Sequence, residues 1–401
     1  MGRSTTFDNV NIASAAFKRN PHDILCRMRD EQPIAEVRAG RRRVWLVTRH
    51  EDVVSLLKDV RFVKDQAKVT GSAPWVPAFA RPLSRNMLDV DEPDHRRLRA
   101  LVSQAFSARM VQAMRGRTEE LVAQLLDQAA RRGRIDLVAD YAVPIPTTII
   151  AQILGVPAAD RTRFHRWTEA VVAADTSPLA MLMALPPVIV MVRYLRRLVA
   201  QKRAEPGDDL TSALIAARDG GEGLSEDELL AMIFLLLVAG HETTTNLIAN
   251  AIFHLSTNAA QRERLACEPS LAPSAVEELL RFDGPLLTAT ERFTVEPTEF
   301  NGTLIPKGAV VYGAIASANR DERLFIEPQS IDLGRKPNRH LSFGDGPHFC
   351  AGAALARLEA QIAIPAFLAR FPRLLAPDNW TPRWKGGIVL RGLKSYPLAV
   401  G

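Results

Sequence analysis

The stretch Phe343–Gly352, which reads FGDGPHFCAG, limits the possible folds of this chain more than any other segment. Its cysteine, Cys350, is followed at once by an alanine-rich segment in which apolar residues recur at helical spacing, so a helix is predicted over Gly352–Arg370. A side chain just ahead of a helix faces unpaired backbone N–H groups and the positive end of the helix dipole. Both favour a thiolate, which we therefore predict at Cys350.

Glycines shape this loop. Gly344, Gly346 and Gly352 let the backbone turn tightly and approach the sulfur, so that amides can donate to it, and Phe343 can pack over the loop. A buried thiolate supported in this way suits an axial ligand of haem iron. A lone cysteine in a glycine-rich turn is more often a small buried hydrophobe, but the F-x-x-G-x-x-x-C-x-G spacing favours the metal-ligand interpretation.

A long helix is predicted from about Ser225 to Thr257. Ser225 and Glu228 form a capping box at its start. The run Ala231–Ala239 is apolar on all sides, which is typical of a helix that crosses a protein core. At about ten residues this run is too short to span a bilayer.

Polar residues then interrupt this apolar helix. Gly240 omits a side chain where a flat ligand could lie, and Glu242 and Thr243 bring a carboxylate and a hydroxyl into the core. Burying such groups unpaired is costly, so a functional reason is one interpretation. The structural alternative is that Thr243 bonds back to a carbonyl one turn earlier while Glu242 reaches solvent.

Two weaker patterns accompany these segments. Glu278 and Arg281 form an E-x-x-R pair, which an exposed ion pair on one helix face explains equally well. Four basic residues could meet the propionates of a haem, although each alone is more often a surface charge. They are His95, Arg99, Arg292 and His348.

In this order, the four elements resemble the cytochrome P-450 family, specifically its soluble bacterial members. The resemblance extends from Trp45–Thr48 through Asp91–Arg99 to the cysteine loop. It implies the cytochrome P-450 fold, mainly α-helical with a small β lobe, as a single domain over residues 1–401. It also implies a haem b cofactor (iron protoporphyrin IX). The implied activity is that of a monooxygenase, which activates O2 with two electrons from a redox partner and hydroxylates or epoxidises a hydrophobic small molecule.

The resemblance also implies roles for individual residues. Cys350 is expected to be the fifth iron ligand, and Glu242 and Thr243 the catalytic acid–alcohol pair that handles protons for dioxygen. Glu278 and Arg281 would be the structural pair beneath the cysteine loop. The residues expected to contact the haem are His95, Arg99, Ala239, Gly240, Arg292, Phe343, Gly346, His348, Cys350 and Gly352.

One segment departs from the family pattern. Many members complete the Glu–Arg network with an arginine in a P-x-R-F stretch, whereas Pro328–Ile331 reads PQSI here. Ser330 supplies no charge. The third partner could be Arg335 or His340, or the network could be smaller.

Two other functions are weighed against the O2-dependent monooxygenase. A peroxide-driven haem oxygenase is the nearer one, but the Glu242–Thr243 pair favours the O2 route. A non-catalytic haem sensor or carrier would need neither that pair nor an apolar substrate chamber, and no signalling domain is evident.

Composition favours one large unit. The chain has 401 residues, 47% of them hydrophobic, and no linker rich in Gly, Ser or Pro, so a single mostly helical body with a sheet-rich lobe is expected. Helical periodicity also marks Ala108–Arg132. The strand-like runs are Arg43–Val47, Thr294–Val311 and Gly387–Leu398.

The cysteines and apolar segments indicate the compartment. Three cysteines argue against a disulfide framework and suit a reducing compartment, so a cytoplasmic monomer is expected. The N-terminal residues lack the apolar core of a signal peptide or membrane anchor. Thr176–Val192 carries no charge, but Pro186 and Pro187 are predicted to break any helix there, so we interpret the segment as an apolar lid and expect no membrane anchor.

The net charge of +6 bears on binding partners. The arginines are spread along predicted helices without an aromatic-interleaved basic patch, so nucleic-acid binding is not expected. A positive surface favours docking of an acidic electron donor, namely a ferredoxin with its own ferredoxin reductase. Candidate docking residues are Arg96, Arg97, Arg109 and Arg357.

The segments that line the substrate chamber in this family are mainly aliphatic in this chain. Trp75 and Phe79 are possible aromatic walls, and neither Pro285–Thr290 nor Thr176–Met191 contains a charged residue. A large, uncharged, hydrophobic substrate such as a terpenoid, steroid, macrolide or fatty-acid-like molecule is therefore expected. The lining segments are Pro74–Met87, Thr176–Met191, Ala231–Thr244, Pro285–Thr290 and Gly387–Val389.

Overall fold

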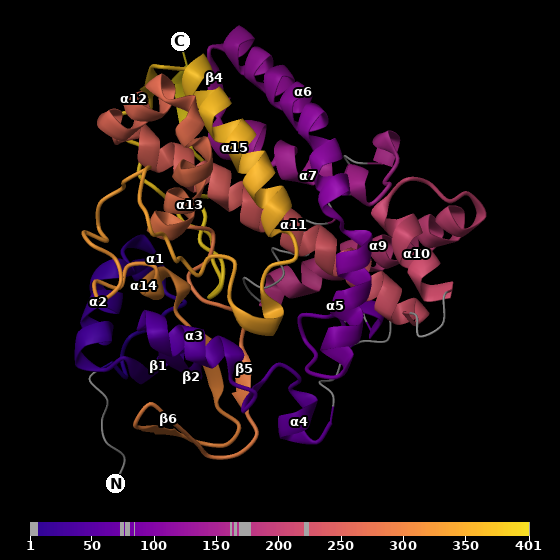
Figure 1. Cartoon of the computed structure of the whole chain (residues 1–401), viewed down its shortest axis with the longest axis vertical. Helices are drawn as coiled ribbons and strands as arrows, with labels where there is room; N and C mark the ends of the chain where they lie inside the picture. Colours follow the sequence, from indigo (N-terminus) through magenta and orange to yellow (C-terminus); the bar gives the residue numbers. More distant parts are fainter. Residues whose placement is uncertain are drawn as a thin grey trace.

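The computed structural model describes residues 7–72, 76, 81–83, 85–160, 163, 167, 178–219 and 224–400. A large helical part lies beside a smaller part built on a β-sheet, as predicted (Figure 1). The longer helices are α2 (His22–Glu31), α3 (His50–Lys58), α5 (Asp94–Ala105), α6 (Ala108–Arg132), α7 (Pro144–Ile153), α9 (Pro178–Ala204), α10 (Leu210–Asp219), α11 (Glu226–Ser256), α12 (Ala259–Cys267), α13 (Ala272–Asp283) and α15 (Ala353–Arg370). Shorter helical segments are α1 (Ala15–Arg19), α4 (Ala67–Thr70), α14 (Ile315–Ala318), η1 (Arg81–Leu83), η2 (Leu137–Ala142), η3 (Ala158–Asp160), η5 (Pro269–Leu271) and η6 (Gly346–His348).

The main sheet of the small lobe has the strand order β1-β2-β8-β5-β3. Its first two strands form an antiparallel hairpin in which Ile34 pairs with Val47, and β2 then pairs with β8 in parallel. A second sheet has the order β4-β10-β9, and β6 and β7 pair with each other. The strands are β1 (Ile34–Ala39), β2 (Arg42–Val47), β3 (Phe62–Val63), β4 (Arg134–Asp136), β5 (Arg292–Thr294), β6 (Thr298–Phe300), β7 (Thr303–Ile305), β8 (Val310–Gly313), β9 (Leu374–Leu375) and β10 (Pro397–Val400).

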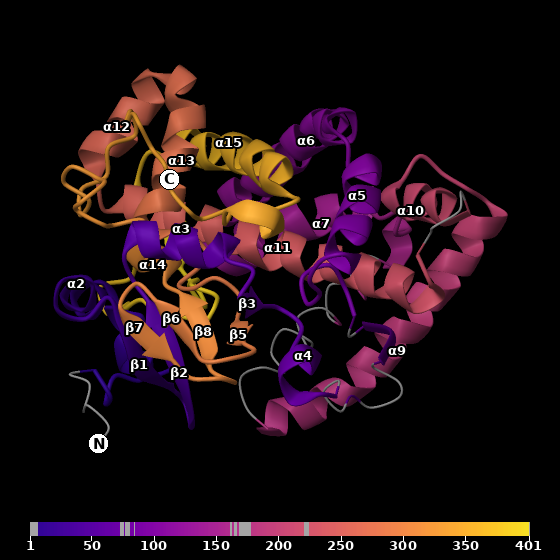
Figure 2. The same cartoon turned by 60° about the horizontal axis from the view of Figure 1, so that its bottom comes forward.

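Helix α11 is the central element of the helical part. It begins with the predicted capping box, because the Ser225 hydroxyl accepts from the Glu228 amide and the Glu228 carboxylate accepts from the Ser225 amide. The helix is long and apolar enough to cross a membrane, and 61% of its most apolar window is buried inside the protein. Because α7, α13 and α15 pack against it, this burial is that of a core helix (Figure 2).

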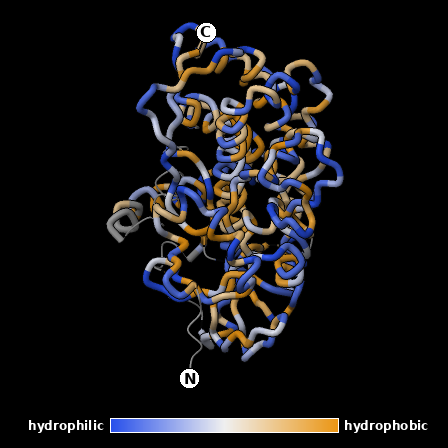
Figure 3. Tube along the Cα trace, turned by 90° about the vertical axis from the view of Figure 1, so that its left-hand side faces the viewer, coloured by the Kyte–Doolittle hydropathy of each residue, from blue (hydrophilic) through white to orange (hydrophobic). Residues whose placement is uncertain are grey.

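Two apolar clusters meet along α11. Its first half, including Leu230 and Leu237, is buried with side chains of α5, α7, α9 and α10. Its second half, including Leu247 and Leu255, is buried with side chains of α6, α13 and α15. The polar segment 241–246 lies between the two clusters. The hydropathy-coloured trace shows apolar stretches concentrated inside the molecule (Figure 3).

The prediction that Pro186 and Pro187 break the helix is wrong. Helix α9 runs continuously from Pro178 to Ala204 with both prolines inside it. An interior proline costs about 3 kcal/mol or more, because it removes one backbone hydrogen bond and its ring clashes with the preceding turn. Burial of Met191, Leu195 and Leu198 farther along α9 offsets this cost.

Candidate active site

The cysteine loop joins η6 to α15. Cys350 lies three residues before Ala353, the first residue of α15, and its amide donates to the Phe343 carbonyl at 2.9 Å, which closes the loop. Gly344 and Gly346 both have φ near +72°, a conformation that favours glycine. Gly352 differs, because its φ is −88° and a Cβ there would meet no protein atom within 4 Å. The backbone therefore does not require glycine at this position, and the space beside it remains open to a ligand.

The protein surroundings shift the pKa of the Cys350 thiol in both directions. Although the residue is exposed, the surrounding protein atoms desolvate the thiol and raise its pKa, against the opposing effects of a hydrogen bond from the Gly352 amide and the positive charges of Arg99 and Arg357. The Gly352 amide at the start of α15 therefore favours the predicted thiolate, whereas desolvation opposes it. A coordinated cation such as haem iron would supply the missing stabilisation, since metal binding deprotonates a thiol.

Glu277 of α13 connects the loop to α15. The Arg357 guanidinium donates to both Glu277 oxygens at 2.7 Å and lies over the Phe343 ring, 4.4 Å from its centroid. Nε2 of His340 lies 3.0 Å from the same carboxylate. Burial alone would raise the pKa of Glu277, but its bonds with Arg357 and His340 outweigh burial and lower that pKa to about 2. This network holds Phe343 over the cysteine loop.

The neighbouring residue Glu278 forms a second, fully buried network. Arg281 donates to both Glu278 oxygens at 2.8 Å, and neither side chain is exposed to solvent. The interpretation of this pair as an exposed surface interaction is therefore excluded. Arg281 also donates to the carbonyls of Asn319, Pro328 and Ser330.

Arg335 is the third member of this network. Its Nε lies 3.1 and 3.0 Å from the two Glu278 oxygens. Of the two candidates from the sequence, Arg335 therefore takes the place of the missing arginine, whereas His340 pairs with Glu277. Ser330 contributes only its carbonyl oxygen, which both Arg281 and Arg335 approach.

We predict that Glu278→Gln lowers the free energy of unfolding by about 3–5 kcal/mol, because two arginines would lose a buried anionic partner. Chemical denaturation measures this change. The matched control is Arg264→Ala, which breaks the half-exposed pair with Asp332 and should cost less than about 1 kcal/mol. Equal losses in the two variants would contradict a buried, anchoring role for Glu278.

The predicted propionate-binding residues lie close together. The rings of His95 on α5 and His348 on η6 are 4.1 Å apart between centroids. Burial, and then the charges of His95, Lys64 and Arg292, lower the pKa of His348 to about 3. Positive groups are thus concentrated at one place in the protein.

The cluster fits an anionic ligand. Arg292 is buried, and among the described residues its guanidinium donates only to the carbonyls of Thr290 and Leu57, both at 3.4 Å. No carboxylate among the described residues forms an ion pair with Arg292 or Arg99. Burial lowers the pKa of Arg292 to about 10. Since a buried cation normally has an anionic partner, the propionates of a haem match this site.

Lys64 is a further member of this cluster that no sequence pattern indicated. Its ammonium is buried and donates to Thr290 Oγ1 at 2.9 Å and to the Glu291 carbonyl at 2.6 Å. Burial, with the nearby charge of Arg292, lowers its pKa to about 8. A lone lysine after strand β3 carries no spacing signal, so only the fold brings it to Arg292.

We predict that Arg292→Ala releases haem faster than the unmodified protein, because a charge-assisted bond to a buried carboxylate contributes about 1.5–3 kcal/mol. Transfer of haem to excess apomyoglobin measures this rate. The matched control is Arg320→Ala, which removes another buried arginine, one that contacts Gln329 and the Phe282 carbonyl. Haem loss at the native rate in Arg292→Ala would place Arg292 outside the propionate site.

Part of the polar segment of α11 is accessible. Ala239 is exposed and Thr243 is half-buried, although most neighbouring residues of the helix are buried. The Thr243 hydroxyl donates to the Ala239 carbonyl at 2.8 Å, so the predicted back-bond is present. Its oxygen can still accept a hydrogen bond. A Cβ at Gly240 would meet Ile150 of α7 at 3.4 Å, close to ordinary van der Waals contact, so packing against α7 does not by itself require glycine.

The alternative in which Glu242 reaches solvent is wrong. Its carboxylate is buried, and Oε1 accepts a hydrogen bond from Lys385 Nζ at 2.6 Å. The two residues are 143 positions apart, and Lys385 has no motif around it that could have identified it. Oε2 lies 3.6 Å from Nε2 of His241.

Two segments expected to line the substrate chamber lie side by side. The Leu287 amide donates to the Val389 carbonyl at 2.8 Å, which joins Pro285–Thr290 to Gly387–Val389. Trp75 and Phe79, the expected aromatic walls, lie outside the described residues, as do parts of Pro74–Met87 and Thr176–Met191.

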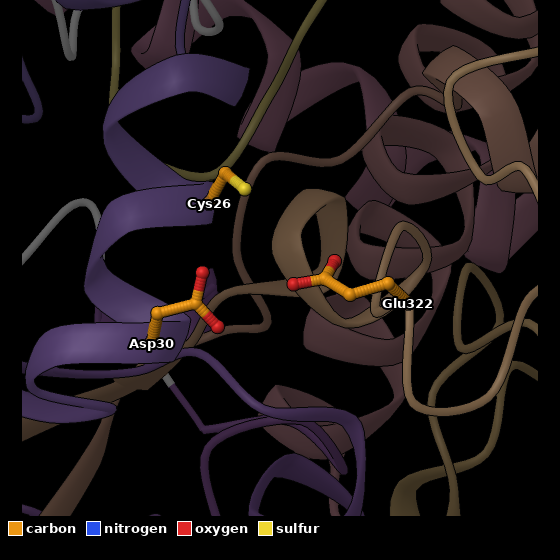
Figure 4. Close-up of side chains that lie close together, drawn as sticks. All are labelled: Cys26, Asp30 and Glu322. Carbon is orange, nitrogen blue, oxygen red and sulfur yellow. The ribbon is translucent and has the colours of Figure 1, made fainter.

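A separate group of possible metal ligands lies on the small lobe. Cys26 and Asp30 of α2 point towards Glu322, and the ligand atoms lie within 4.8 Å of one another (Figure 4). However, Arg29 donates to Glu322 at 2.8 Å and Arg323 donates to Asp30 at 3.1 Å. Since arginines already neutralise both carboxylates, the arrangement is that of an ion-pair cluster.

Comparison with known proteins identifies the family. The family model described as Cytochrome P450 matches residues 8–394. The chain is 43% identical to Cytochrome P450 107B1 of Saccharopolyspora erythraea over 397 residues, 96% of each protein. It is 42% identical to the Cytochrome P450 monooxygenase PikC of Streptomyces venezuelae over 389 residues, 95% of this chain and 91% of PikC. The solved structure of PksS from Bacillus subtilis 168 matches with a TM-score of 0.91 and 37% identity, covering 98% and 100% of the two chains.

The chain therefore belongs to the cytochrome P450 family of haem-thiolate proteins. Its relatives are monooxygenases, hydroxylases and epoxidases, and it is a bacterial-type P450 monooxygenase, as the sequence motifs predicted. The predicted fold is confirmed. Neither the peroxide-driven oxygenase nor the haem sensor or carrier finds support among these relatives.

Proposed function

We propose that this protein binds haem b between the cysteine loop and the accessible part of α11, and inserts oxygen into a large hydrophobic molecule. Support comes from accessible surface on both sides of this site, since Cys350 and Phe349 of the loop and Ala239 of the helix are exposed beside buried residues. Haem, when bound, supplies the iron chemistry that reduces O2. The observation that carries the proposal is the accessible hydroxyl of Thr243 directly beside the buried carboxylate of Glu242.

In this proposal the protein residues have separate roles. Cys350 Sγ would bind the iron, and Arg292, Arg99, His95 and His348 would hold the propionates by charge and hydrogen bonding.

Thr243 Oγ1 of α11 donates its hydrogen to the Ala239 carbonyl, so it would accept a hydrogen bond at the place where oxygen is reduced. Glu242 holds and passes a proton from solvent towards that hydroxyl. The surrounding apolar side chains of α11, such as Leu237, exclude other water, which keeps the reaction coupled to the substrate.

The proposed substrate is a large uncharged molecule. The uncharged residues of Pro285–Thr290 and their pairing with Gly387–Val389 support an apolar wall. Two relatives at 39% and 40% identity carry the names Vitamin D(3) 25-hydroxylase and Mycinamicin IV hydroxylase/epoxidase. We propose the same general class for this chain, namely a polycyclic or macrocyclic secondary metabolite.

We predict that Thr243→Ala retains haem and substrate binding but forms less product for each NAD(P)H consumed, with peroxide as the by-product. The reason is that the hydrogen-bonding hydroxyl is lost while the remaining contacts stay. The matched control is Thr245→Val on the same helix, whose hydroxyl is buried and without a hydrogen-bond partner among the described residues. Product formation at the native ratio in Thr243→Ala would rule out the proposed role.

We further propose a cytoplasmic, monomeric, single-domain enzyme that receives electrons from a ferredoxin and its reductase. The structure changes the choice of docking residues. Arg357 donates to Glu277 and Arg97 donates to Glu228, so both arginines already have carboxylate partners within the protein. Arg96 is 83% exposed, although it also pairs with Glu92. Arg109 at the start of α6 is exposed, and no ion pair to it is present among the described residues.

We predict that Arg109→Glu slows reduction by a bacterial ferredoxin several-fold at low ionic strength, and that the difference disappears as salt increases. Stopped-flow reduction measures the rate. The control is Arg41→Glu, the same charge change in the exposed β1–β2 turn of the small lobe. Rates insensitive to both salt and Arg109→Glu would exclude docking at this surface.

A further inference from the structure

The segment 383–394 forms a hairpin that returns to α11. The Lys385 amide donates to the Gly392 carbonyl at 2.8 Å, and the Lys394 amide donates to the Arg383 carbonyl at 2.8 Å. Trp384 and Leu393 pair as an antiparallel bridge between these bonds. The hairpin therefore has a fixed register, which determines where each of its side chains points.

The backbone of this hairpin rests directly on α11. A Cβ at Gly392 would overlap the side chain of Asn246, so only glycine allows this close approach. Asn250 donates to the carbonyl of Arg391 at 3.1 Å and to that of Asp283 at 3.2 Å. Asn246 and Asn250 lie one and two turns after Glu242 on the same helix.

The far side of the hairpin is anchored by a buried ion pair. The Arg391 guanidinium donates to Asp283 and to the Lys18 carbonyl, and it lies 3.7 Å from the centroid of the Trp384 ring. Asp283 is also 2.7 Å from Nε2 of His254. Because Arg391 and Asp283 are buried and paired with each other, they hold the hairpin against the core.

This anchoring brings one ammonium group to one carboxylate. Lys385 Nζ lies 2.6 Å from Glu242 Oε1, with the two side chains 24% and 9% exposed. A carboxylate so deeply buried needs a charged or hydrogen-bonding partner. Lys385 therefore connects the buried acid to the solvent-accessible edge of the hairpin.

We propose that Lys385 is a positioning residue for Glu242, and that it sets how efficiently this carboxylate passes protons to the oxygen-reducing site. The inference rests on the proposed proton role of Glu242. Lys385 Nζ holds Oε1 on the hairpin side of α11 in a single orientation, and its exposed part gives solvent protons access to the pair. Each proton passed from Glu242 is replaced from water at this edge, so no other reactant is required.

The experiment compares Lys385→Met, Lys385→Arg, Glu242→Gln and the double variant Glu242→Gln/Lys385→Met. We expect Lys385→Met to form several-fold less product per NAD(P)H and to show a larger solvent deuterium isotope effect on turnover. Lys385→Arg keeps the positive charge and should restore most of the product yield. The double variant should be no worse than Glu242→Gln, because both changes affect one function.

Lys394→Met is the matched control, since Lys394 lies in the same hairpin but is exposed, with no ion pair among the described residues. The ferrous–CO spectrum and the substrate-induced spin shift of every variant show that haem and substrate still bind. If Glu242→Gln is impaired while Lys385→Met matches Lys394→Met, the positioning role is overturned and the role of Glu242 stands. If Glu242→Gln turns over like the unmodified enzyme, the role of Glu242 fails and this inference fails with it.

Discussion

Two consecutive carboxylates of α13 determine where the cysteine loop lies. Glu278 points into the protein and, with no water to solvate it, is satisfied by Arg281 and Arg335. Glu277 is bound by Arg357 of α15 and by His340. Glu277 and Glu278 are adjacent, and together they bind the segment before the loop, through Arg335 and His340, and the helix after it, through Arg357 of α15. The loop therefore has little freedom to move relative to α13.

Further buried bonds continue this support along the chain. The Ser342 hydroxyl donates to the Leu280 carbonyl at 2.7 Å, and Asn319 donates to Ser342 at 2.9 Å. Ser342, directly before the loop, is thus held by two buried side-chain bonds. In the proposed function, this support preorganises the position of the Cys350 sulfur.

Sequence reasoning succeeded where a local pattern determines the structure. The ranges predicted for α6, α11 and α15 agree with the structure to within one residue, because capping residues and apolar periodicity lie within each segment. It failed at α9, where distant packing outweighed the two prolines. The strand-like run Gly387–Leu398 contains only the first residues of β10, since most of it is the hairpin that rests on α11.

In the candidate site, too, some residues are indicated by a local pattern and others are brought together only by the fold. The cysteine loop has its own spacing signal, whereas Lys64, Arg335 and Lys385 reach the site through contacts that span many residues. Arg335 could be named as a candidate only because a family arginine was missing. No pattern indicated Lys385, because its position depends on the register of the hairpin and on a glycine–asparagine contact.

The central claim is that Cys350 supplies the thiolate ligand of the haem iron. The absorption spectrum of the reduced, CO-bound protein tests it most directly. We predict a strongly red-shifted Soret band in the unmodified protein and in the control variants Cys26→Ser and Cys267→Ser, and loss of that band in Cys350→Ser. Retention of the red-shifted band in Cys350→Ser would contradict the assignment of the iron ligand.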